Sequence, residues 1–181
     1  MKPFYAVFEV GSPIASSLQE NQAKVEKGWM ALLGSEQGIR RVVLPQPSPR
    51  AAVEALGKAA DGCIRGDSAF ADLQEQIKGY FKGEVKGFTA RLDLSEITPF
   101  QRQVYEVNNT IPYGETRSYG WVAQHLGKPE AARAVGQALA RNPLPLLIPC
   151  HRVVAGDGGL GGYGGGLGLK RWLLEMEAAH R

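Results

Sequence analysis

The sequence predicts a two-domain protein of the α/β (α+β) class, with an N-terminal β-sheet carrying helices and a mainly helical C-terminal domain that contains a helix-turn-helix. Three observations favour this class. The first third of the chain has short β-prone runs separated by Gly, Ser and Pro; helical spacing of apolar residues follows; and a new, capped helix opens after about residue 95. We therefore expect domains at residues 1–95 and 96–181.

The first domain begins with strand-like segments at 4–18 and 28–45, in which Gly, Ser and Pro separate the β-prone runs as they do in hairpins. A helix is expected at about 49–59, after a proline-rich stretch. A second is expected at about 68–81, because apolar residues recur there at helical spacing. Segment 83–96 returns to extended chain.

The second domain opens at Thr98, a helix cap followed by proline at the first helical position. Ser118 can cap a short helix that ends at Leu126, and a second helix is expected from about Ala131 to Arg141. This second helix has little side-chain bulk, so it can lie close either to another helix or to a DNA groove. The small residues are Ala131, Ala132, Ala134, Gly136, Ala138 and Ala140.

The final helix is expected at about 167–179, with Leu169, Trp172, Leu173 and Met176 on one stripe. At 100° per residue Glu177 falls beside this stripe and can turn inward, whereas Glu175 points away. Before this helix lies a glycine-rich segment, 156–168, in which nine of thirteen residues are glycine. Such a segment is either a flexible connector or a place where backbone N–H groups approach a ligand.

Composition indicates a globular protein of the cytoplasm. Of the 181 residues 44% are hydrophobic and 22% are charged, and no apolar run is long enough for a membrane helix. The first residues do not resemble a signal peptide. The net charge is +3, and its excess lies in residues 97–181, with 9 basic and 6 acidic side chains. The arginines at 133, 141 and 152 fall in a stretch free of acidic residues, which predicts either a phosphate-attracting face or an ordinary solvated surface.

The stretch LPLLIPCHRVVAG, residues 144–156, places Cys150 beside His151 at the end of an apolar run that we interpret as a strand. The thiol is a nucleophile, a metal ligand or part of a buried strand end. As a nucleophile it needs a base, because a free thiol is mostly protonated at neutral pH. Adjacent side chains on a strand point to opposite faces, so either the backbone turns after Pro149 or a water joins sulfur to imidazole. Glu177 is the candidate to orient the histidine.

The two cysteines, Cys63 and Cys150, are too far apart in the sequence to suggest a disulfide framework, and we take Cys63 to be a buried packing residue. The His and Cys spacings do not suggest a zinc site. We expect neither a metal nor a cofactor.

The segment NPLPLLIPCHRVV resembles the active-site signature of the O6-alkylguanine-DNA alkyltransferases, which repair DNA by direct reversal. The segments TPFQRQVYEVNNTIPYGETRSY, AARAVGQAL and GGYGGGLGLKRWLLEMEA resemble the same family in the same order. The resemblance is strong from about Phe81 onward and faint before Phe70. It implies an RNase H-like first domain and irreversible, single-turnover transfer of an alkyl group from O6-alkylguanine, with O4-alkylthymine a second candidate substrate.

The resemblance also implies roles for individual residues. Cys150 would attack the alkyl carbon, His151 (through a water) and Glu177 would deprotonate it, and Tyr119 would hydrogen-bond the guanine ring. Asn142 would hold the turn before the active-site strand, and Arg133 would enter the base stack after the nucleotide is flipped. The expected DNA-binding residues are Arg133, Ala131, Ala132, Gly136 and Arg141. The expected pocket residues are Tyr163, Gly164, Val153, Pro145 and Leu139.

The expected partner is double-stranded DNA containing O6-alkylguanine, bound by a monomer, with no membrane association. Two rivals stay open from the residues alone. A cysteine hydrolase would use Cys150 and His151 on acyl substrates, and a DNA-binding regulator would use the helix-turn-helix without chemistry.

Overall fold

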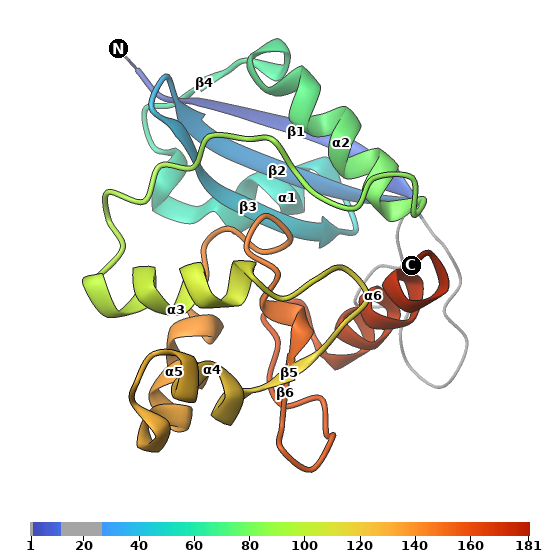
Figure 1. Cartoon of the computed structure of the whole chain (residues 1–181). Helices are drawn as coiled ribbons and strands as arrows, with labels where there is room; N and C mark the ends of the chain where they lie inside the picture. Colours follow the sequence, from blue (N-terminus) through green and yellow to red (C-terminus); the bar gives the residue numbers. More distant parts are fainter. Residues whose placement is uncertain (1, 12–26) are drawn as a thin grey trace. The chain divides into compact units, whose positions relative to one another are not determined.

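The computed structural model describes residues 2–11 and 27–181, which divide into two compact units, Met1–Asp93 and Leu94–Arg181 (Figure 1). The first unit is a sheet with helices and the second is mainly helical, so the predicted fold class is confirmed. The predicted strand segment 4–18 is described only as far as Gly11, and the rest of it lies outside the described residues.

The sheet of the first unit has the strand order β3-β2-β1-β4. Strands β1 (Phe4–Gly11), β2 (Lys27–Ser35) and β3 (Gly38–Gln46) are antiparallel neighbours, and the two-residue β4 (Ile64–Arg65) runs parallel to β1. The register pairs Val7 with Ala31 and Ala31 with Val43, which places apolar side chains of three strands on one face. The sequence did not predict β4, which is too short to show a pattern.

Helix α1 (Pro49–Leu56) begins at the Ser48 cap and continues as the 3-10 turn η2 (Gly57–Ala60). Its Ala52 and Leu56 are fully buried in a cluster with Val7, Ala31 and other residues of the sheet. The second predicted helix is a 3-10 turn, η3 (Asp67–Phe70), followed by α2 (Ala71–Phe81). Helices α1 and α2 both lie along the sheet (Figure 1).

Cys63 packs against the cluster around α1 but is only half-buried, so the prediction of a buried position is wrong and that of a packing role is confirmed. It precedes the edge strand β4 and packs only partly against the cluster around α1, while its thiol donates weakly to the Ala59 carbonyl at 3.4 Å. The short edge strand leaves one side of this position open.

The second unit begins with α3 (Pro99–Asn109), whose Thr98 cap and Gln101 form a capping box. Strand β5 (Arg117–Ser118) pairs in parallel with β6 (Val153–Val154). The helix-turn-helix consists of α4 (Tyr119–His125), a 3-10 turn η4 (Pro129–Ala131) and α5 (Ala132–Ala140). The last elements are the 3-10 turn η5 (Cys150–Arg152) and α6 (Leu167–Ala179).

Helices α3 and α5 pack together in the second unit (Figure 1). Tyr105 is buried in α3 and donates a hydrogen bond to the Ala138 carbonyl of α5 at 3.1 Å. Burial, with a smaller contribution from the Cys150 charge, raises the pKa of Tyr105 to about 12. Helix α5 therefore both packs on a neighbour, with Val135 and Leu139 buried, and leaves Arg133 exposed.

Asn108 at the end of α3 is fully buried, and neither side-chain polar atom has a hydrogen-bond partner among the described residues. Burying an amide without partners costs about 1–3 kcal/mol. Asn108→Leu is therefore expected to raise the free energy of unfolding by about 1 kcal/mol or more, measured by urea denaturation. The adjacent Asn109 is exposed, so Asn109→Leu is the matched control and should change little. A loss of stability in Asn108→Leu would contradict this account.

No helix in the described part of the chain is long and apolar enough to span a membrane.

Candidate active site

A cavity of about 850 Å³ lies between α4, α5 and the glycine-rich segment that follows β6. Many residues expected in the site line it together, although they are far apart in the sequence. These are Tyr119, Ala132, Arg133, Gly136, Leu139, Cys150, Tyr163 and Gly164. Cys150 is only 8% exposed, so its thiol borders the cavity from a nearly buried position.

The segment before Cys150 is not a strand, and that prediction is wrong. Leu146 has a φ of 72°, which breaks the extended run, and the chain turns so that Ile148 N–H donates to the Leu144 carbonyl at 2.9 Å. Cys150 then opens the 3-10 turn η5. Of the two alternatives considered for bringing Cys150 and His151 together, a turn after Pro149 or a bridging water, the structure has the turn after Pro149.

Asn142 fastens this turn. Its side-chain nitrogen donates to the Ile148 carbonyl at 3.0 Å and to the Cys150 sulfur at 3.2 Å, while its oxygen accepts from the Leu144 N–H at 2.9 Å. Burial raises the pKa of the Cys150 thiol, and the Asn142 amide, Lys170 and the N–H groups of Cys150 and His151 oppose that rise. The resting site therefore holds a protonated thiol surrounded by groups that stabilise an anion.

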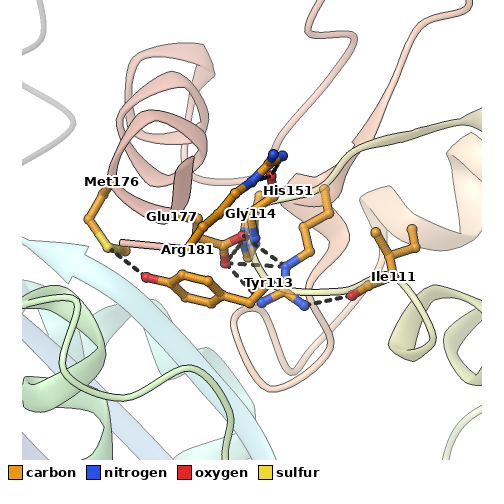
Figure 2. A network of polar contacts seen from close by, with 8 residues as sticks. Ile111, Tyr113, Gly114, His151, Met176, Glu177 and Arg181 are labelled. Carbon is orange, nitrogen blue, oxygen red and sulfur yellow. Dashed lines mark hydrogen bonds and ion pairs between the residues drawn. The ribbon is translucent and has the colours of Figure 1, made fainter. Parts of the chain in front are cut away.

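Behind the thiol, His151 is paired with Glu177 (Figure 2). Both side chains are fully buried, and His151 Nε2 lies 2.9 Å from Glu177 Oε1. Burial lowers the pKa of His151 although Glu177 acts to raise it, so the ring is neutral at pH 7. A neutral ring that donates Nε2–H to the carboxylate leaves Nδ1 as the basic nitrogen.

Glu177 is held by more than the histidine. Arg152 donates to both of its oxygens at 2.9–3.2 Å and to the Ile111 carbonyl at 2.8 Å, and the Gly114 N–H donates to Oε2 at 2.9 Å. Figure 2 shows the carboxylate at the centre of these contacts. Arg152 therefore offsets the charge of the buried carboxylate and fixes its orientation.

The position of Gly114 requires glycine. Its φ is 75°, and a Cβ there would lie 2.7 Å from the Arg181 side chain and 3.0 Å from the Glu177 carbonyl. Its carbonyl accepts from Arg181 Nε at 2.8 Å, so the turn is fixed at both backbone polar groups (Figure 2). Beside it, the Tyr113 hydroxyl donates to the Met176 sulfur at 3.3 Å.

Arg152 does not contribute to a positive surface, in contrast to the sequence-based expectation. It is 8% exposed because its guanidinium is required by Glu177. Arg133 and Arg141 are exposed, and only Arg133 borders the cavity. The cationic face near the cavity is therefore smaller than the sequence suggested.

The two tyrosines of the cavity lie close to the reactive groups. The Tyr163 ring meets the His151 ring edge-on, with centroids 6.4 Å apart, and its hydroxyl is buried without a hydrogen-bond partner among the described residues. Burial raises the pKa of Tyr119, while the nearby Gly162 backbone opposes the rise. Both hydroxyls are therefore protonated donors at neutral pH.

The remaining expected residues lie outside the cavity lining. Ala131 and Arg141 flank α5, and Pro145 is buried in the turn before Cys150. Val153 is fully buried, and its carbonyl accepts a hydrogen bond from Lys170 at 2.6 Å. Among the described residues, no group of three or more His, Cys, Asp and Glu side chains is arranged to hold a metal ion.

Three residues of the site were not predicted from the sequence: Gly114, Arg152 and Lys170. Arg152 directly follows the Cys-His pair, and Gly114 ends the Pro-Tyr-Gly turn. Lys170 lies seven residues before Glu177, so the two share one face of α6. Helical spacing therefore places this lysine on the same inward-facing stripe as Glu177.

The fold and the site define a protein with a cysteine at a cavity beside a helix-turn-helix. Residues 99–179 match the family model for the 6-O-methylguanine DNA methyltransferase DNA-binding domain. A methylated-DNA–protein-cysteine methyltransferase of Methanosarcina acetivorans is 37% identical over 97% of this chain and 99% of its own length, and one of Mycobacterium leprae is 51% identical over 64% of this chain and 70% of its own.

The solved structure of Mycobacterium tuberculosis OGT in complex with DNA has a TM-score of 0.77 and 37% identity, covering 98% of this chain and 94% of that one. The O6-methylguanine-DNA methyltransferase of Pyrococcus kodakaraensis has a TM-score of 0.73 and 25% identity, covering 96% and 98%. The chain therefore belongs to the family of methylated-DNA–protein-cysteine methyltransferases.

Proposed function

We propose that this protein repairs double-stranded DNA by transferring the alkyl group from O6 of guanine to the sulfur of Cys150, once per molecule. The observation that carries the proposal is the position of the thiol. It borders a cavity large enough for a base, with anion-stabilising donors on the sulfur and the His151–Glu177 pair behind it. The family membership and the DNA complex of a relative support the choice of substrate.

In the proposed reaction a sulfur–carbon bond forms as the carbon–O6 bond breaks. The thiol proton passes through a water to Nδ1 of His151, while Glu177 stabilises the imidazolium that results. Tyr119 donates a hydrogen bond to a guanine ring nitrogen and offsets the charge that develops on the leaving base. The base finally takes up one proton, so atoms and charge balance, and the protein keeps a neutral thioether.

Access to the cavity requires the damaged nucleotide to leave the duplex, at a cost of a few kcal/mol. We propose that α5 approaches the minor groove with Ala131, Ala132 and Gly136, while Arg141 contacts the backbone. Tyr163, Gly164 and Leu139 line the pocket. Pro145 and the Val153 carbonyl, which lie outside the lining in the free protein, contact the base once DNA is bound, and the carbonyl then also accepts from the guanine amino group. O4-alkylthymine is a second candidate substrate of the same pocket.

The test is intact-mass measurement after incubation with duplex DNA containing O6-methylguanine under reducing conditions. We expect one methyl mass per molecule, on the peptide that contains Cys150. Repeated turnover of an activated ester without a lasting gain in mass would identify a hydrolase instead. Binding to a particular undamaged sequence without any adduct would identify a regulator.

Arg133 is exposed at the rim of the cavity and is proposed to fill the space that the flipped nucleotide leaves. Arg133→Ala is expected to slow repair of duplex DNA at least about tenfold, because losing about 1.4 kcal/mol of flipping energy corresponds to that factor. Reaction with free O6-benzylguanine should be nearly unchanged. Arg171→Ala, an exposed arginine of α6, is the control. Equal losses on both substrates would contradict this role.

We also propose that the protein acts as a cytoplasmic monomer without a cofactor. All the groups of the proposed reaction come from the single unit Leu94–Arg181, and a reduced thiol suits the cytosol. Sedimentation of the free protein and of its complex with a short lesion duplex tests the monomer. A dimer as the active species would overturn that part of the proposal.

A further inference from the structure

Lys170 is a lysine in the core of the second unit. It lies in the first turns of α6 and is fully buried, which is rare for a lysine. Its ammonium group donates to the carbonyl of Val153 at 2.6 Å, to that of Leu160, and to that of Gly162 at 3.4 Å. A buried cation is stable only when its donors are satisfied, so these three carbonyls define its position.

The three carbonyls belong to two segments of the site. Val153 follows directly on the turn that carries Cys150, whereas Leu160 and Gly162 belong to the glycine-rich segment 156–168. Glycine loses more backbone entropy than any other residue when it is fixed in one conformation. Lys170 therefore joins a segment of high conformational freedom to the backbone beside the nucleophile.

The glycine-rich segment in turn contacts Tyr119. Gly162 of this segment and Tyr119 both line the cavity. Gly161 has a φ of 66°, and a Cβ there would lie 2.7 Å from the Tyr119 hydroxyl oxygen, so the backbone reaches the tyrosine only because no side chain intervenes. The position of the tyrosine hydroxyl therefore depends on where the Gly161 backbone is held.

We infer that Lys170 is a positioning residue for the alkyl transfer: by holding the Leu160–Gly162 segment against Val153 it keeps the Gly161 backbone against the Tyr119 hydroxyl, and this holds the hydroxyl in place for the substrate base. The inference rests on the proposed function, in which Tyr119 donates to the leaving guanine. Lys170 itself does not border the cavity.

The charge of Lys170 decides how many carbonyls it can hold. Burial lowers its pKa to about 8, although the Cys150 charge acts to raise it, and Lys170 in turn helps to lower the pKa of His151. Below pH 8 the ammonium offers three N–H donors. Above pH 8 the neutral amine offers two and turns a lone pair toward a third carbonyl, so one of the three contacts is lost and the segment is held less firmly.

The experiment compares the wild-type protein with Lys170→Met, using free O6-benzylguanine as the probe so that DNA binding does not contribute. We expect the second-order rate constant to fall at least about tenfold at pH 7, because a misplacement of about 1 Å costs up to about a hundredfold. The ratio of wild-type to variant rate constants should fall as the pH rises above 8. Arg171→Met, the exposed neighbour on the same helix, is the control and should react like the wild type.

A double substitution distinguishes positioning from simple packing. If Lys170 acts through Tyr119, Lys170→Met combined with Tyr119→Phe should lose little more than the more damaging single change. Losses that multiply, or a ratio that stays constant from pH 6.5 to 9.5, would overturn the inference. Lys170→Met should still gain one alkyl group on Cys150 at long times, whereas failure of the proposed function would appear as no adduct on the wild type.

If Lys170→Met does not fold, the pH dependence of the rate constants of the wild type and of Tyr119→Phe tests the inference instead. The rate advantage of the wild type over Tyr119→Phe should shrink as the pH rises through 8, because a segment held by fewer contacts positions the hydroxyl less well. An advantage that persists unchanged to pH 9.5 would overturn the inference.

Discussion

Cys150→Ser is expected to abolish alkyl transfer to below the detection limit while leaving the affinity for lesion-containing DNA intact. The hydroxyl of serine is far less acidic than a thiol, so the neutral His151 cannot generate the anion that attack at a saturated carbon requires. The substitution replaces a nearly buried sulfur with an oxygen and changes the volume of the side chain little. Mass spectrometry of the protein and a binding titration of the same duplex measure the two effects.

Cys63→Ser is the matched control for this prediction. Cys63 belongs to the other unit of the chain and is half-buried, so its loss should leave the adduct on Cys150 unchanged. An adduct that survives in Cys150→Ser, or that moves to Cys63, would remove Cys150 from the reaction.

Glu177→Gln is expected to have two large effects. The amide cannot stabilise a histidinium as a carboxylate does, so alkylation should slow by about a hundredfold. The change also leaves the Arg152 guanidinium buried opposite a neutral group, and breaking a buried ion pair on one side typically costs about 3–5 kcal/mol of unfolding free energy. Quenched time-course assays measure the loss of alkylation rate, and urea denaturation measures the loss of unfolding free energy.

Glu175→Gln is the control, since this carboxylate is exposed on the opposite side of the same helix. A Glu177→Gln protein of normal stability would show that the ion pair with Arg152 contributes little. A normal rate would show that His151 does not need the carboxylate. Helix α6 would then have only a packing role.

Much of this site could be predicted from the sequence because its chemistry is concentrated in short segments. The pair Cys150–His151 is adjacent in the chain, and helical spacing selected Glu177 over Glu175. The structure brings these groups together: His151 Nε2 lies 2.9 Å from Glu177, and Cys150 lies at the cavity with Tyr119 and Arg133. The roles assigned to these residues stay predictions.

The parts that were missed are those where a polar group turns inward. A sequence pattern treats Arg152 and Lys170 as surface charges, because an isolated charge is costly to bury. Only the tertiary structure reveals that Glu177 pairs with one of them and that three backbone carbonyls surround the other. Gly114 was missed for a related reason, since its close contacts come from residues at 177 and 181.

The predicted strand before Cys150 failed because apolar composition does not distinguish a strand from a buried turn. Pro145 and Pro149 supply no N–H donors for a ladder, and Leu146 adopts a left-handed conformation. Asn142 replaces the missing ladder with side-chain hydrogen bonds. The two prolines were the available signal against a strand.

Helix α6 contacts the tetrapeptide Cys150–Val153 through two side chains. Glu177 binds His151 and Arg152, and Lys170 binds the carbonyl of Val153. The two side chains are seven residues apart, which is two turns and about 10.5 Å of helix. The spacing between Lys170 and Glu177 is consequently as important to the site as the two residues themselves. Deleting a single residue between 170 and 177 would rotate one of the two side chains about 100° around the helix axis relative to the other. Its contact with the tetrapeptide would be lost, even though every reactive side chain remained in the protein.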